Sequence, residues 1–151
     1  MTPDQTILVV EDDADDVYFM KRALVAAGIT NPVLVLSNGQ HALDYLGGVG
    51  KYADRTLYPL PFVAFVDLKM PYVDGFEILA WKKEQPALDS LVMVVLTSSD
   101  QVRDTQRAYA LGARSYLVKP VQPTELKQFL MSMKSYWRLP EQGGPIRLGQ
   151  A

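Results

Sequence analysis

The sequence predicts a doubly wound α/β domain, in which helices cover both faces of a parallel sheet. Short apolar runs rich in valine recur along the chain, and such runs are typical of strands buried on both faces. A segment with helical spacing follows each run. Because parallel neighbours need crossover connections, and right-handed crossovers place helices on both sides of a sheet, this alternation indicates the doubly wound class. The 151 residues, 48% of them hydrophobic, suffice for one core.

Five strands and five following helices are predicted. The strands are residues 6–10, 33–36, 61–66, 92–96 and 116–118. The first helix carries Val17, Met20, Leu24 and Ala27 on one face and stops at Gly28, and the third carries Phe76, Leu79 and Lys83 before Gln85 and Pro86. The last predicted helix has Leu126, Phe129, Leu130, Met133 and Trp137 on one face. Ligands of such a sheet bind beyond the carboxyl ends of its strands.

Two segments interrupt the pattern. Residues 47–59 break the periodicity and are predicted to be a long loop between the second helix and the third strand. Residues 139–151 are rich in proline and glycine and are predicted to be a mobile C-terminal tail. We therefore expect one domain over residues 6–138. No separate output domain is expected, because the residues after Trp137 are few and lack apolar periodicity.

Composition excludes several classes of function. The net charge is −2 and the lysines and arginines are scattered, so the basic stripe that nucleic acids require is absent from the sequence. With no cysteine, the chain has neither disulfides nor thiolate metal sites, as a reduced compartment allows. No apolar run approaches the roughly 20 residues that span a bilayer. A cytoplasmic protein without a nucleic-acid or membrane partner is expected.

Polar residues stand where the predicted strands end. Glu11 and Asp12 follow the first strand, Asp67 ends the third, Thr97 the fourth and Lys119 the fifth, so all should meet at one edge. Three carboxylates need a cation, and oxygen ligands without histidine or cysteine suit a hard ion such as Mg²⁺. The lysine and the threonine hydroxyl would offer a positive charge and a hydrogen bond to a tetrahedral anion, as phosphoryl transfer demands. Asp67 is then the predicted nucleophile.

Four blocks of sequence resemble the signature of response-regulator receiver domains in two-component signalling. They are VVEDD at residues 9–13, VDLKMPYVDGFEIL at 66–79, VLTSS at 95–99 and YLVKP at 116–120. Their order, spacing and flanking residues all match, and the resemblance runs from Thr6 to about Trp137. It implies a flavodoxin-like (βα)5 fold with a five-stranded parallel sheet in the order 2-1-3-4-5.

The resemblance also implies a role for each residue of the site. Glu11 and Asp12 would hold Mg²⁺, Asp67 would both bind it and accept the phosphoryl group, and the backbone carbonyl of Lys69 would be a further ligand. Thr97 would hydrogen-bond a phosphoryl oxygen and Lys119 would pair with it. Tyr116 would be the aromatic switch that follows Thr97, and the peptide bond before Pro120 would be cis.

The implied function is that of a single-domain response regulator. A histidine kinase would donate the phosphoryl group to Asp67, and the modified protein would bind its downstream partner differently. The protein would catalyse its own phosphorylation and dephosphorylation without acting on another substrate. The loop at 47–59 and the tail resemble regulators partnered with phytochrome-type histidine kinases, in which the fifth-helix region supports a homodimer. Met133, Tyr136 and Trp137 would form the dimer patch or, more simply, belong to the core.

Two other functions are weighed against this one. A pseudo-receiver would keep the fold and bind partners without phosphate, although the complete set of site residues favours phosphorylation. A phosphatase of the haloacid dehalogenase type would need a second aspartate two residues after Asp67, where this chain has Lys69. His41, the only histidine, is expected at an exposed helix position rather than in a phosphorelay.

Overall fold

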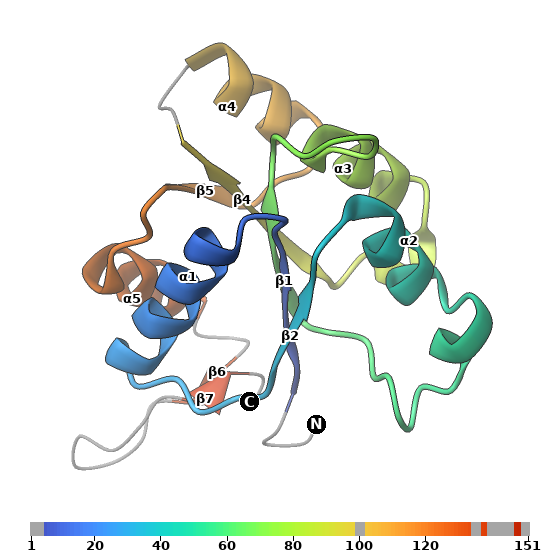
Figure 1. The fold of residues 1–151 in the computed structure, drawn as a ribbon, viewed down its shortest axis with the longest axis horizontal. Coiled ribbons are helices and arrows are strands. Elements are labelled where there is room, and N and C mark those ends of the chain that lie inside the picture. Colours follow the sequence, from blue (N-terminus) through green and yellow to red (C-terminus); the bar gives the residue numbers. More distant parts are fainter. Residues whose placement is uncertain (1–4, 99–101, 134–136, 139–146, 149–151) are drawn as a thin grey trace.

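The predicted fold is confirmed. The computed structural model describes residues 5–98, 102–133, 137–138 and 147–148. A parallel sheet has the order β2-β1-β3-β4-β5 (Figure 1). Its strands are β1 (Ile7–Val10), β2 (Val33–Leu36), β3 (Val63–Asp67), β4 (Val92–Thr97) and β5 (Ser115–Val118). Among the described residues, no helix has the length and hydropathy to cross a bilayer.

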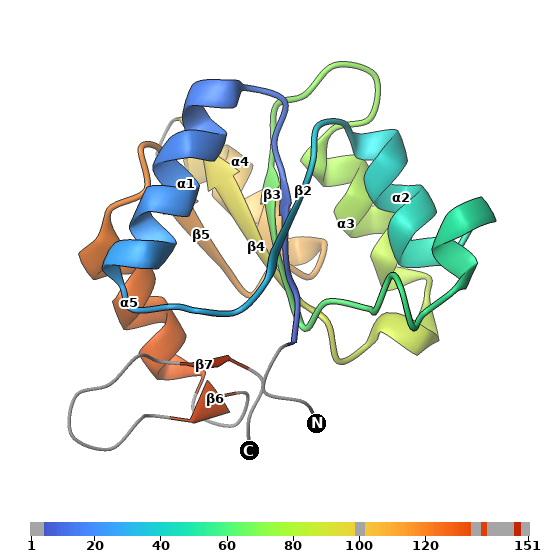
Figure 2. The same cartoon turned by 60° about the horizontal axis from the view of Figure 1, so that its bottom comes forward.

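Helices cover both faces of the sheet, as Figure 2 shows. One side carries α1 (Ala14–Ala26) and α5 (Pro123–Ser132), and the other carries α2 (Gly39–Gly47), α3 (Gly75–Lys83) and α4 (Val102–Ala110). Successive residues of a strand point to opposite faces. In β1, Ile7 and Val9 therefore belong to the core under α1 and α5, while Leu8 and Val10 belong to the other core. All four are fully buried, which explains the continuous apolar run.

Short polar side chains cap three of the helices. The side chain of Asp13 accepts hydrogen bonds from backbone N–H groups at the start of α1, Asn38 does the same for α2, and Asp74 for α3. Each cap lies in the connection that leaves the carboxyl end of a strand, so these helices begin at the edge where the strands end. The positive ends of their dipoles thus lie at the edge that carries the acidic side chains.

The prediction of a long loop over residues 47–59 is wrong in part. The helix α2 ends at Gly47, and a short 3-10 helix, η1 (Gly50–Ala53), follows it. The guanidinium of Arg55 ties the segment back to α2, donating to the carbonyls of Tyr45 at 2.7 Å and Leu46 at 3.0 Å. The rings of Tyr45, Tyr52 and Tyr58 pack edge to face with centroids 5.1–6.5 Å apart. Such side-chain contacts order a segment without leaving any periodicity in the sequence.

The last helix is shorter than predicted. α5 ends at Ser132, and Trp137 lies in β6 (Trp137–Arg138), which pairs antiparallel with β7 (Arg147–Leu148). Met133 is 1% exposed and belongs to the core under α1 and α5, so its apolar character is explained by packing. Tyr136 of the predicted dimer patch lies outside the described residues, and so do the residues of the predicted tail apart from the two in β7.

Candidate phosphoryl-acceptor site

The first strand ends in two acidic residues that differ in burial. Glu11 is 1% exposed, whereas Asp12 is exposed. The backbone N–H of Glu11 donates to the carbonyl of Leu36 at 3.1 Å, which continues the pairing of β1 with β2. The Glu11 Oε2 atom accepts the N–H of Asp13 at 3.2 Å. This turn therefore holds one carboxylate inside the protein and leaves the next at the opening of the site.

Asp67 is the last residue of β3 and is buried. Its Oδ1 atom accepts the backbone N–H of Lys69 at 3.2 Å. Gly75, at the start of α3, lies so close that a Cβ atom there would come within 2.5 Å of the Asp67 carbonyl oxygen. Only glycine fits such an approach. The Asp-Gly pair that opens α3 therefore lets this helix pack directly behind Asp67.

Lys119 follows β5 and reaches across to three carboxylates. Its backbone N–H donates to the carbonyl of Thr97 at 2.7 Å, and its peptide bond to Pro120 is cis, as the resemblance implied. Its Nζ atom lies 2.6 Å from Glu11 Oε1, 3.0 Å from Asp16 Oδ2 and 3.1 Å from Asp67 Oδ2. The lysine side chain is only 12% exposed, so these contacts form in a site from which water is largely excluded.

The crowding of acids around one ammonium shifts two pKa values. Burial, reinforced by the hydrogen bond and charge of Asp67, raises the pKa of Glu11 to about 8, although Lys119 opposes the shift. Burial alone would lower the pKa of Lys119. The hydrogen bonds to Glu11 and Asp16 and the charge of Asp67 outweigh it, and the pKa of the lysine rises above its ordinary value. The lysine therefore stays charged.

Three of the acids form a group suited to a cation. One carboxylate oxygen from each of Glu11, Asp12 and Asp67 lies within 4.8 Å of the other two, and we call this group the acidic cluster. Carboxylate oxygens are what Mg²⁺ and Ca²⁺ prefer. A cation would also relieve the repulsion between Asp67 and Glu11 that contributes to the raised pKa of Glu11. The residues that the sequence predicts as metal ligands thus fit such an ion.

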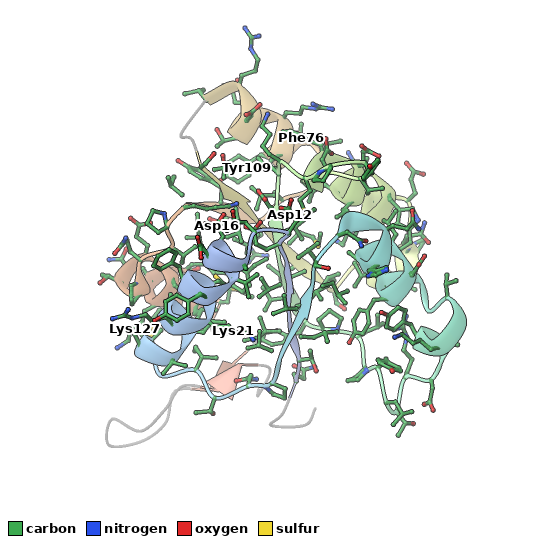
Figure 3. All side chains as sticks on the ribbon, viewed as in Figure 1. Asp12, Asp16, Lys21, Phe76, Tyr109 and Lys127 are labelled. Atoms are coloured by element: carbon green, nitrogen blue, oxygen red, sulfur yellow. The ribbon has the colours of Figure 1, made fainter. Side chains whose placement is uncertain are left out.

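The two predicted switch residues lie on neighbouring strands. Thr97 is the last residue of β4 and is 2% exposed, whereas Tyr116 on β5 is half-buried. The ring of Tyr116 packs edge to face against Tyr109 of α4, with centroids 6.2 Å apart. Figure 3 labels Tyr109 on this helix. Tyr116 therefore connects the strand beside Thr97 with a surface helix.

One residue of the site was not predicted. Asp16, in the first turn of α1, contacts Lys119 through its Oδ2 atom. The run of acids from Glu11 to Asp16 was a signal, but the sequence cannot say which of them faces the end of β5. The side chain of Lys69 lies away from the acidic cluster, 67% exposed and 3.5 Å from Asp104 of α4. His41 is exposed on α2, as predicted.

Residues 7–131 match the response regulator receiver domain. The chain belongs to this family. Two curated relatives are similar to the receiver along most of its length. The probable methanogenesis regulatory protein FilR2 of Methanothrix harundinacea (strain 6Ac) is 37% identical over 87% of the chain and 82% of the relative. The other relative is the response regulator Rcp1 of Synechocystis sp.. Rcp1 is 31% identical over 89% of the chain and 90% of its own length.

Solved structures of response regulators resemble this receiver along most of its length. The bacteriophytochrome response regulator RtBRR superposes with a TM-score of 0.80 at 34% identity, over 93% of this chain and 84% of that one. The Mn²⁺-bound form of Rcp1 gives 0.70 at 30% identity over 87% and 92%. The phosphorylated cyanobacterial phytochrome response regulator RcpA gives 0.72 at 29% identity over 87% and 91%. The receiver is thus related to single-domain regulators of phytochrome-type signalling.

Proposed function

We propose that the protein is a single-domain response regulator that accepts a phosphoryl group on Asp67 in a Mg²⁺-dependent reaction. The observation that carries the proposal is the contact of the Lys119 ammonium with Asp67 Oδ2 at 3.1 Å, beside a second buried carboxylate, Glu11. A strand-end aspartate is commonly a helix cap, but here Asp74 caps the following helix. Asp67 is therefore available for chemistry.

The acidic cluster is the proposed Mg²⁺ site. Glu11, Asp12 and Asp67 would hold the ion together with the backbone carbonyl of Lys69, directly or through water. Mg²⁺ bound there supplies positive charge that offsets the charge developing on the phosphoryl oxygens. The Mn²⁺-bound structure of Rcp1 supports a divalent-ion site in a related receiver. Asp12, exposed at the opening, is the ligand most accessible to water.

In the proposed transfer, a carboxylate oxygen of Asp67 attacks the phosphorus of the donor phosphohistidine. The new O–P bond forms as the P–N bond breaks, and the leaving imidazole keeps the electron pair. The Lys119 ammonium stabilises the equatorial oxygens, and the hydroxyl of Thr97 donates a hydrogen bond to one of them. Most of the rate enhancement would come from positioning and charge, since Asp67 is itself the nucleophile.

The proposed output passes through Thr97 and Tyr116. Phosphorylation would draw Thr97 toward the phosphoryl group and let Tyr116 turn inward, away from Tyr109. The surface made by α4, β5 and α5 would then change its shape. The side chain of Tyr116 is half-buried, a degree of burial that leaves room for such a movement.

The proposed phosphodonor is a histidine kinase of the phytochrome type. Relatives that are named as phytochrome response regulators support this partner. A homodimer through the fifth-helix region stays a prediction. Met133 does not belong to the predicted dimer patch, because it is buried in the core. Sedimentation with and without a phosphoryl mimic measures it, and a monomer at high concentration in both states would contradict it.

The phosphatase alternative lacks its general acid. Lys69 occupies the position of the required second aspartate, and its ammonium lies against Asp104 rather than near Asp67. Turnover of an external phosphomonoester is therefore not expected. Phosphorylation of Asp67 distinguishes the proposal from the pseudo-receiver alternative, which binds partners without phosphate.

The test is to incubate the protein with Mg²⁺ and acetyl phosphate and to measure intact mass for the wild type and Asp67→Asn. The expected result is a single base-labile phosphoryl adduct that needs Mg²⁺ and is absent from the variant, because the amide is not a nucleophile of this kind. If both folded proteins stay unmodified, the pseudo-receiver interpretation replaces the proposal. Asp44→Asn, a change on α2 away from the strand ends, is the matched control.

A further inference from the structure

Asp16 contacts the catalytic lysine from outside the acidic cluster. It lies in the first turn of α1, and Figure 3 shows it at the same end of the sheet as Asp12. The Asp13 side chain accepts the N–H groups of Asp15 at 2.8 Å and Asp16 at 3.1 Å, which fixes the backbone of this turn. The carboxylate of Asp16 is therefore presented to Lys119 by an anchored helix terminus rather than by a free loop.

The three partners of the Lys119 ammonium differ in what else they bind. An ammonium has three N–H donors, and Glu11, Asp16 and Asp67 lie within 3.1 Å of it. Glu11 and Asp67 also belong to the acidic cluster, whereas Asp16 does not. When a cation binds and a phosphoryl group forms on Asp67, both of those carboxylates gain new partners. Asp16 is the one that can keep its hydrogen bond to the lysine.

We propose that Asp16 is a positioning residue for Lys119. Its carboxylate accepts a hydrogen bond from one N–H of the ammonium at the side of the site. The other N–H donors then point toward Asp67, where the phosphoryl group would form. The Asp16 side chain is 29% exposed, so the contact is partly screened and restrains the lysine without immobilising it. The inference rests on the proposed function, since it assigns a role within the same site.

The variants that test it are Asp16→Asn, Asp16→Glu and Asp15→Asn. Asp15 is the matched control, because it is exposed, lies in the same turn and carries the same charge. Three quantities are measured for each folded variant. They are the rate of adduct formation with acetyl phosphate, the Mg²⁺ dissociation constant by calorimetry without a phosphodonor, and the ¹⁵N signal of the Lys119 ammonium with Mg²⁺ bound.

Asp16→Asn should slow adduct formation about tenfold, the size expected when one charged hydrogen-bond partner is lost. Its Lys119 ammonium signal should disappear through faster exchange with water, while Mg²⁺ affinity should stay near the wild-type value because Asp16 lies outside the acidic cluster. Asp16→Glu should recover part of both effects, since the carboxylate is restored. Asp15→Asn should match the wild type in all three measurements.

Two results would overturn the assignment. Equal effects of Asp16→Asn and Asp15→Asn would mean that only the charge of the turn matters. A loss of Mg²⁺ affinity in Asp16→Asn as large as that in Asp12→Asn would make Asp16 a metal ligand. If the wild type itself takes up no phosphoryl group, the proposed function fails, and the Lys119 ammonium signal in the same variants still decides whether Asp16 holds the lysine.

Discussion

The acidic cluster with Lys119 and the pair Tyr109 and Tyr116 lie at neighbouring parts of the sheet, but they are built differently. In the first region, buried ionisable side chains contact one another at 2.6–3.1 Å. In the second, two rings, one half-buried and one exposed, touch edge to face at a centroid distance of 6.2 Å. Buried charges interact far more strongly than aromatic pairs. The chemistry is therefore held rigidly, and the proposed reporting region can move at small cost in free energy.

This difference fits a switch. A nucleophile, a cation and a phosphoryl group need fixed positions, because a displacement of about 1 Å can cost about a hundredfold in rate. A reporting surface needs two arrangements of similar free energy. The largest effects of substitution are therefore expected where the contacts are closest, and the smallest where they are weakest.

The largest effect is expected from Lys119→Met, which removes the ammonium and keeps much of the side-chain volume. Adduct formation with acetyl phosphate should slow by about 100- to 1000-fold, the usual result of removing one preorganised group that stabilises the transition state. The measurement is intact mass against time at saturating Mg²⁺. Lys127→Met, an exposed position on α5, is the control and should keep the wild-type rate. A normal rate in Lys119→Met would show that the lysine only balances charge in the resting protein.

The second effect is a dependence of Mg²⁺ affinity on pH. Because the pKa of Glu11 is raised to about 8, this group is largely protonated near neutral pH and must lose its proton to bind a cation. Affinity should rise by up to about tenfold per pH unit below the pKa and become constant above it. The raised pKa of Glu11 also makes the stability of the metal-free protein depend on pH. The contribution of Glu11 to that stability is full below its ordinary pKa of 4.5 and is lost as pH rises through about 8.

Calorimetry in buffers of different ionisation enthalpy measures the proton released on Mg²⁺ binding. Glu11→Gln is the comparison, since it removes the titrating group at the same position. Its Mg²⁺ affinity should be weak and nearly independent of pH over the same range. If the wild type binds Mg²⁺ equally well from about pH 6 to about pH 8, the range below the raised pKa in which affinity should rise, Glu11 is already ionised in the metal-free protein.

What could be predicted from the sequence are the features that follow from the strand pattern. The strand-end residues Glu11, Asp67, Thr97 and Lys119 could be assigned to one edge because parallel strands place their carboxyl ends together. That inference needs only the strand pattern. The burial of both strand faces also follows from continuous apolar runs, as in β1.

Features that depend on side-chain direction could not be predicted. Asp16 is one of several acids in its turn, and only the packing of α1 beside the end of β5 selects it as a partner of Lys119. Trp137 continues the apolar spacing of the last helix, yet the chain leaves the helix at Ser132 and Trp137 pairs with Leu148. The segment that holds η1 depends on Arg55 and on tyrosines packed edge to face, which are contacts between residues without periodic spacing.

The smallest effect is expected at Tyr109 and Tyr116. A double-mutant cycle with Tyr109→Ala and Tyr116→Ala, measured by denaturant unfolding, should give a coupling energy of about 1 kcal/mol for this edge-to-face pair. Tyr109→Ala alone should keep the rate of adduct formation within about twofold, because Tyr109 lies on α4 and is not a member of the acidic cluster, and distant sites usually act independently. Tyr109→Phe keeps the ring and should show little loss of stability. A coupling above about 3 kcal/mol, the upper end for residues in contact, or a large loss of phosphorylation in Tyr109→Ala, would mean that the chemistry and the reporting surface form one rigid unit.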